Sequence, residues 1–168
     1  MEDQIDFRQA DVREHLHFPD QAFDVIVCLD MICHVLDRCS LFREWSRVLR
    51  PSGRMLYTDP VVVTGLISKE EFATRSSTGD FAFGPPGVNE RLIGDAGFEL
   101  VRTEDVTENE VDVSRRWHDA RQQQAAELIR LEGEETFAGL QTFLATVHRL
   151  TSERRMSRFV YVGRKQRK

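Results

Sequence analysis

The clearest pattern of apolar and polar positions lies in the first third of the chain. A short apolar run from Phe23 to Leu29 is rich in Val and Ile, which is typical of a strand buried on both faces. From Asp37 to Leu49 the apolar residues recur three and four positions apart, which predicts a helix capped by Asp37. A second strand, Met55 to Thr58, follows. These elements indicate a parallel crossover unit, whose ligand side is the carboxyl end of its strands.

Weaker patterns extend this unit in both directions. Gln4 to Arg8, Phe98 to Val106 and Arg158 to Arg164 are candidate strands. The capping box Ser68-Lys69-Glu70-Glu71 opens a short helix, and Val88 to Ala96 is another helix that Gly97 ends. We therefore expect an α/β domain with an open, mostly parallel sheet of five strands that begins with Ile5 to Arg8.

Two long helical patterns precede the last strand. One runs from Val113 to Glu132 and the other from Glu134 to Glu153, with Gly133 between them. The pair predicts a helical hairpin within residues 112–153 of a single domain that spans residues 1–168. The apolar stripes of the hairpin are those of Val113, Trp117, Ala120, Leu128 and Leu131, and of Phe137, Leu140, Phe143, Leu144, Val147 and Leu150.

Composition narrows the class of protein. The 168 residues are 40% hydrophobic and 30% charged, enough for one core, and the net charge of −5 disfavours a nucleic-acid partner. No run is long enough to span a membrane. The three cysteines, Cys28, Cys33 and Cys39, lack the spacing of a zinc site or an even count for disulfides, so we expect no metal and a reducing, cytoplasmic location.

Several of these segments resemble a known family. Phe23-Asp24-Val25-Ile26, the acidic Asp30, His34 with Asp37, and Arg47-Val48-Leu49-Arg50-Pro51-Ser52-Gly53 resemble the middle of class I S-adenosylmethionine-dependent methyltransferases of the type 11 kind. Ser52 stands where the family motif has its first glycine. The resemblance implies a Rossmann-like sheet that lacks its first two strands. It also implies that the last strand is antiparallel to its neighbours, and that the hairpin is an insertion before that strand.

The same resemblance implies a cofactor site and a substrate site. S-adenosylmethionine would contact residues that end two strands, namely Asp11, Val12, Leu29, Asp30 and Met31. The carboxylate of Asp11 would accept the adenine amino group; alternatively, Asp11 caps a short helix from Val12 to Leu16.

Two residues are candidates for chemistry. Methyl transfer is an in-line displacement that depends mainly on positioning, and a histidine is the usual base for an oxygen nucleophile. His34 is the candidate base, although it could instead cap the following loop or pair with Asp37. Asp59 ends a strand and is a candidate contact for a substrate amine or hydroxyl. The hairpin either covers the substrate pocket as a lid or simply packs on the sheet.

The resemblance begins at the family's third strand, and the printed residues contain no G-x-G. We therefore expect weak or absent binding of S-adenosylmethionine. Two functions remain open: a methyltransferase for a small molecule with an incomplete cofactor site, and a non-catalytic remnant that self-associates or binds a partner. Because Phe23 to Leu29 offers an apolar edge without Pro or Lys, we expect a homodimer.

Overall fold

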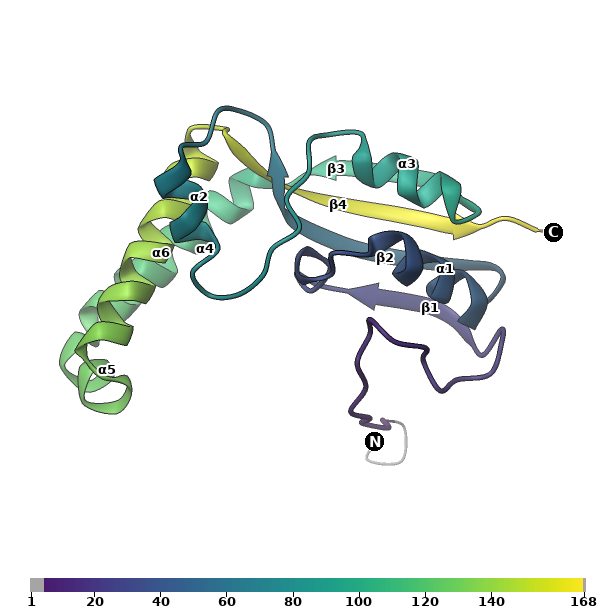
Figure 1. The fold of residues 1–168 in the computed structure, drawn as a ribbon, viewed down its shortest axis with the longest axis horizontal. Coiled ribbons are helices and arrows are strands. Elements are labelled where there is room, and N and C mark those ends of the chain that lie inside the picture. The colour runs from purple at the N-terminus through teal and green to yellow at the C-terminus, as the bar shows by residue number, and fades with distance from the viewer. Residues whose placement is uncertain (1–4, 168) are drawn as a thin grey trace.

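The fold is built on a sheet with helices packed on it and a helical hairpin that projects from one end (Figure 1). The computed structural model describes residues 5–167. Within them the sheet has four strands in the spatial order β1-β2-β4-β3. The strands are β1 (Phe23–Cys28), β2 (Leu49–Val63), β3 (Phe98–Asp105) and β4 (Met156–Lys165).

Strand directions agree with the prediction, and the number of strands corrects it. β1 and β2 are parallel, while β4 is antiparallel to both β2 and β3, as expected for the last strand. β1, β2 and β3 therefore run in one direction and only β4 is reversed, as predicted for a mostly parallel sheet, but the described sheet has four strands rather than five. Ile5 and Phe7 are 64% and 91% exposed and lie in irregular chain, since no strand in the described residues lies beside them to pair; Gln4 falls outside those residues.

The crossover unit forms as predicted. Helix α1 (Arg38–Val48) starts at Asp37, whose carboxylate accepts a hydrogen bond of 3.0 Å from the Ser40 amide. Its apolar stripe is buried against β2. There the Tyr57 ring stacks on Tyr161 of β4, with ring centroids 5.0 Å apart, which joins the two antiparallel strands through the core.

Strand β1 differs from its prediction in burial. Cys28 is 6% exposed, but Val25 and Val27 on the opposite face are 55% and 62% exposed, and Leu29 just beyond the strand is 64% exposed. β1 is the edge strand of the described sheet, and α1 covers only one of its faces. The strand is therefore buried on one face only, and its other face presents an apolar surface.

Three helices make up the predicted hairpin. They are α4 (Thr107–Gln123), α5 (Ala125–Glu132) and α6 (Glu134–Ser152). The first arm starts six residues earlier than the predicted Val113 and is interrupted at Gln124, which caps both α4 and α5. Gly133 turns the chain with φ +88°, a region that glycine adopts without strain. α6 buries much of its stripe, whereas Trp117 remains 59% exposed.

Three short elements complete the fold. A single 3-10 turn, η2 (Ile32–His34), follows β1, and α3 (Val88–Asp95) packs near β3. Helix α2 (Lys69–Arg75) packs on α6, and both hydrogen bonds of its predicted capping box, between Ser68 and Glu71, are present. None of the helices in residues 5–167 is both long and apolar enough to span a membrane.

Candidate functional site

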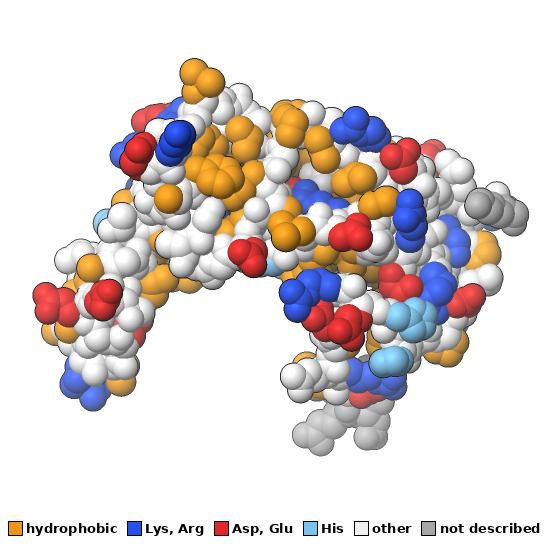
Figure 2. Space-filling view, in the orientation of Figure 1, with side chains coloured by type: hydrophobic (Ala, Val, Ile, Leu, Met, Phe, Trp, Pro, Cys, Tyr) orange, Lys and Arg blue, Asp and Glu red, His pale blue; other side chains and the backbone are white. Residues whose placement is uncertain are grey.

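A cleft of about 340 Å³ lies between the carboxyl end of β1 and the hairpin. Figure 2 shows the molecule as an arch, hollowed between the hairpin and the N-terminal segment. The walls of the cleft come from segments far apart in sequence. Asp30 and His34 follow β1, Arg75 ends α2, Phe81 lies in the next loop, and Glu110 and Trp117 belong to α4.

Asp30 stands at the end of β1 in a left-handed backbone conformation, with φ +52°. Its amide donates a hydrogen bond of 2.8 Å to Thr58 Oγ1, and that hydroxyl donates to Asp30 Oδ1 at 2.6 Å. Aspartate tolerates this conformation better than most residues, but it remains uncommon. The contacts with β2 hold it, so the side chain of Asp30 has a defined direction at the ligand side of the sheet.

An arginine connects this strand end to the hairpin. Arg158 of β4 donates to Asp30 Oδ2 at 2.7 Å and to Glu110 Oε2 at 3.0 Å. Burial raises the pKa of Glu110, and the positive charge of Arg158 opposes that rise. The two ion pairs fix the first turns of α4 against the sheet, so the hairpin forms a wall of the cleft.

His34 lies in the cleft wall with an assignable tautomer. Its Nδ1 is 2.9 Å from the carbonyl oxygen of Asp80, and a carbonyl oxygen can only accept, so Nδ1 donates. In the neutral ring the lone pair is then on Nε2, which is free to accept a proton. The Phe81 ring lies 4.4 Å from the imidazole, between centroids. His34 does not pair with Asp37, whose carboxylate caps α1 instead.

Asp59 is placed differently from its prediction. Its side chain is 1% exposed, and Oδ2 accepts from Arg38 at 2.6 Å and from Asn89 at 2.8 Å. Oδ1 accepts from the Val61 amide at 3.2 Å. A carboxylate with these partners is part of an internal ion pair that joins α1, β2 and α3. The assignment of Asp59 to a substrate is therefore corrected.

The predicted cofactor residues lie outside the cleft, apart from Asp30. Asp11 is exposed, and hydrogen bonds from Arg13 lower the pKa of its carboxyl group to about 2. It caps a turn rather than the alternative helix from Val12 to Leu16, since these residues form no helix. Val12 and Met31 pack partly buried against the core, while Leu29 is exposed.

Sequence patterns did not indicate three residues of the cleft. Arg75, Glu110 and Arg158 come from a short helix, the early turns of α4 and the final strand. The capping box located the helix that ends at Arg75, but nothing in the sequence shows that its last side chain turns inward. Glu110 lies before the predicted start of the hairpin, in a polar stretch without an apolar stripe. Only the folded chain brings the three charges together.

Comparison with known proteins gives a consistent picture. Residues 1–57 match the methyltransferase domain family. The chain is 31% identical over 125 residues to phosphoethanolamine N-methyltransferase 3 of Arabidopsis thaliana, which covers 74% of this chain and 25% of that protein. It is 32% identical over 111 residues to the 27-O-demethylrifamycin SV methyltransferase of Amycolatopsis mediterranei (strain S699). That match covers 64% of this chain and 40% of that protein.

The solved structures agree in fold. Phosphoethanolamine N-methyltransferase 2 of Haemonchus contortus, solved with phosphomonomethylethanolamine and S-adenosylhomocysteine, superposes with a TM-score of 0.80 at 19% identity. The superposition covers 90% of this chain and 35% of that one. The chain therefore spans well under half of the length of the relatives described here, and the likeness to the solved structure concerns the fold.

Proposed function

Because the chain resembles class I S-adenosylmethionine-dependent methyltransferases in both sequence and fold, we propose that it binds the methyl acceptor in such an enzyme and that the acceptor is a small molecule. The observation that carries this proposal is the cleft at the carboxyl end of β1, where ligands of this type of sheet bind. Its volume of about 340 Å³ suits a small acceptor.

The described residues fit one wall of a cofactor site. Asp11 exposes a carboxylate that can accept from an adenine amine, and Leu29 exposes an apolar side chain suited to a base. Neither residue lines the cleft, so these contacts alone enclose no cofactor. When bound, S-adenosylmethionine would supply an electrophilic methyl group on a sulfonium. The sequence predicts weak or absent binding; because one wall of the site is present, we propose weak binding, in the millimolar range.

His34 is the proposed base for the acceptor. Its Nδ1 is occupied by the Asp80 carbonyl, so Nε2 is the atom that can take a proton from the acceptor. Asp30 is proposed to orient the bound molecules at the strand end, since Thr58 and Arg158 fix its carboxylate. The hairpin supports a lid role, because α4 supplies Glu110 and Trp117 to the cleft and limits the access of water.

Self-association is the second part of the proposal. Val25 and Val27 on the open face of the edge strand β1, with Leu29 just beyond it, form an exposed apolar surface. Such an edge is a template for pairing with a second copy, so a homodimer remains our expectation. This surface is also the observation that favours the second function, a self-associating module without catalysis. The cytoplasmic location stays a prediction from the free cysteines.

A methyl-transfer assay separates the two functions. The chain is incubated at millimolar S-adenosylmethionine with a panel of small amines and hydroxy acids, and methylated products are detected by mass spectrometry. We expect product with the wild-type chain and about 10²-fold less with His34→Asn, which keeps a donor near Nδ1 but lacks Nε2. An equal rate in His34→Asn would remove the base assignment. A complete absence of product, with an intact relative active in parallel, favours the non-catalytic module.

A further inference from the structure

One arginine in the cleft wall has an unusual environment. Arg75, the last residue of α2, is 4% exposed, and its Nε and Nη1 have no hydrogen-bond partner among the described residues. Its guanidinium lies over two aromatic rings, 4.4 Å from the centroid of Phe81 and 5.0 Å from that of Phe143. The rings supply some cation–π attraction, but they leave the donors of the guanidinium unused.

A second buried arginine in the chain shows what a structural role requires. Arg38 is 5% exposed and donates to Asp59, to Asn89 and to the carbonyl oxygen of Ala82, at distances of 2.6, 2.8 and 2.7 Å. These contacts satisfy its charge inside the protein. Arg75 is as deeply buried but lacks such partners, and burial lowers its pKa. A guanidinium nonetheless stays protonated, so a positive charge that has no hydrogen-bond partner within residues 5–167 faces the cleft.

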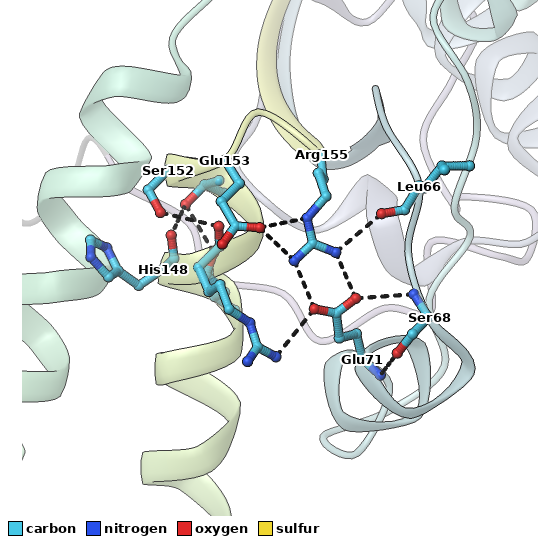
Figure 3. A network of polar contacts seen from close by, with 10 residues as sticks. Leu66, Ser68, Glu71, His148, Ser152, Glu153 and Arg155 are labelled. Atoms are coloured by element: carbon cyan, nitrogen blue, oxygen red, sulfur yellow. Dashed lines mark hydrogen bonds and ion pairs between the residues drawn. The ribbon is translucent and has the colours of Figure 1, made fainter.

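The surrounding contacts leave the buried guanidinium of Arg75 without a carboxylate partner. Figure 3 shows Glu71, one helical turn before Arg75, bound by Arg155 through hydrogen bonds of 2.6 and 2.7 Å. Arg149 of α6 lies 3.2 Å from the same carboxylate, and Ser68 completes the cap of α2. The nearest carboxylate on the helix is therefore already engaged. These bonds also fasten α2 to α6 and to the start of β4, so the position of Arg75 is rigid.

We propose that Arg75 binds an anionic group, a carboxylate or a phosphoryl group, of the small molecule that occupies the cleft. The planar fork of a guanidinium matches both groups in a bidentate way. The two carboxylates that share the cleft, those of Asp30 and Glu110, are already paired with Arg158, so Arg75 is the positive charge left for a ligand. That this molecule is the methyl acceptor rests on the proposed function.

The test measures anion binding to the whole chain. Wild type is titrated with inorganic phosphate, with acetate and with uncharged acetamide at constant ionic strength. The readouts are Tm and tryptophan fluorescence, to which Trp117 in the cleft and the buried Trp45 both contribute. We expect saturable binding of phosphate or acetate but not of acetamide, and the tighter anion identifies the group. Arg75→Met should bind that anion at least about tenfold more weakly than wild type. The affinity of Arg75→Lys for the anion should lie between those of wild type and Arg75→Met.

The matched control is Arg115→Met, which removes a 55% exposed arginine of α4 that pairs with Asp112 and does not line the cleft. This control variant should bind the anion within about twofold of wild type, because solvent screens the charge of the arginine that it removes. Without the anion, Arg75→Met should melt at the same temperature as wild type or higher, since it removes a buried unpaired charge. A lowered Tm with unchanged anion binding, or no binding of either anion to wild type, overturns the proposal and leaves Arg75 a packing residue.

Titration with S-adenosylhomocysteine keeps this inference apart from the proposed function. If Arg75→Met weakens its binding as much as that of phosphate, Arg75 serves the carboxylate of the cofactor, and the acceptor assignment is wrong. Unchanged binding of S-adenosylhomocysteine with tenfold weaker anion binding supports the acceptor assignment. Anion binding through Arg75 in a chain that shows no cofactor binding and no methyl transfer would instead count against the proposed function alone.

Discussion

Replacing Arg38 by methionine should strongly destabilise the fold. The side chains of Arg38 and Asp59 are 6% and 1% exposed, and their ion pair is 2.6 Å long. Arg38→Met leaves the Asp59 carboxylate buried with only Asn89 and the Val61 amide as donors. Removing one partner of a buried pair costs about 3–5 kcal/mol, because the other charge remains without compensation. For a chain of this length the loss corresponds to a fall in Tm of roughly 6–20 °C.

The assay is urea unfolding followed by far-UV circular dichroism at fixed protein concentration. The matched control is Arg50→Met, which breaks a 2.7 Å ion pair with Asp24 whose side chains are 53% and 74% exposed. That change should cost less than about 1 kcal/mol. The double variant Arg38→Met/Asp59→Leu should recover much of the loss. If Arg38→Met proves no more costly than Arg50→Met, the interpretation of Asp59 as part of a structural ion pair is wrong.

Three further predictions concern pH, association and thiols. Hydrogen bonds from Arg155 lower the pKa of Glu71 from 4.5 to about 2. The contribution of Glu71 to the stability of the fold is therefore full above pH 4.5 and disappears as the pH falls toward 2. Glu71→Gln should flatten the dependence of stability on pH in this window, as measured by unfolding at each pH. Wild type should sediment as a dimer at tens of micromolar and Val27→Lys as a monomer, whereas a monomeric wild type contradicts the homodimer. Burial raises the pKa of Cys33 to about 12, so Cys39 should react with a thiol reagent in the native chain and Cys33 only after unfolding.

Local signals in the sequence predicted local structure correctly. Asp37 caps α1, and Ser68 with Glu71 forms the capping box of α2, because these bonds join residues three positions apart. The start of α4 was missed, since its first turns carry no apolar stripe. That start is instead marked by Thr107, whose amide donates to Asp105 Oδ1 at 2.9 Å.

The candidate site depended on contacts that no local pattern encodes. Asp59 looked available at a strand end, but its partners Arg38 and Asn89 lie 21 and 30 positions away in sequence. Arg75 looked like an ordinary basic residue at a helix end, and only the packing of Phe81 and Phe143 around it makes it a buried charge. His34 was predicted from the family resemblance, while its tautomer follows from the carbonyl of Asp80, 46 positions away.

The central claim is that this chain supplies part of a methyltransferase site at the carboxyl end of β1. The most direct measurement is a titration of the isotope-labelled chain with S-adenosylhomocysteine, followed by amide NMR shifts. We predict weak, saturable binding in the millimolar range, with shifts at Asp11 and from Leu29 to Met31. Shifts confined to other surfaces, or no shifts at several times that concentration, would contradict the account. Submicromolar binding would contradict the expectation that the described residues form only one wall of the cofactor site.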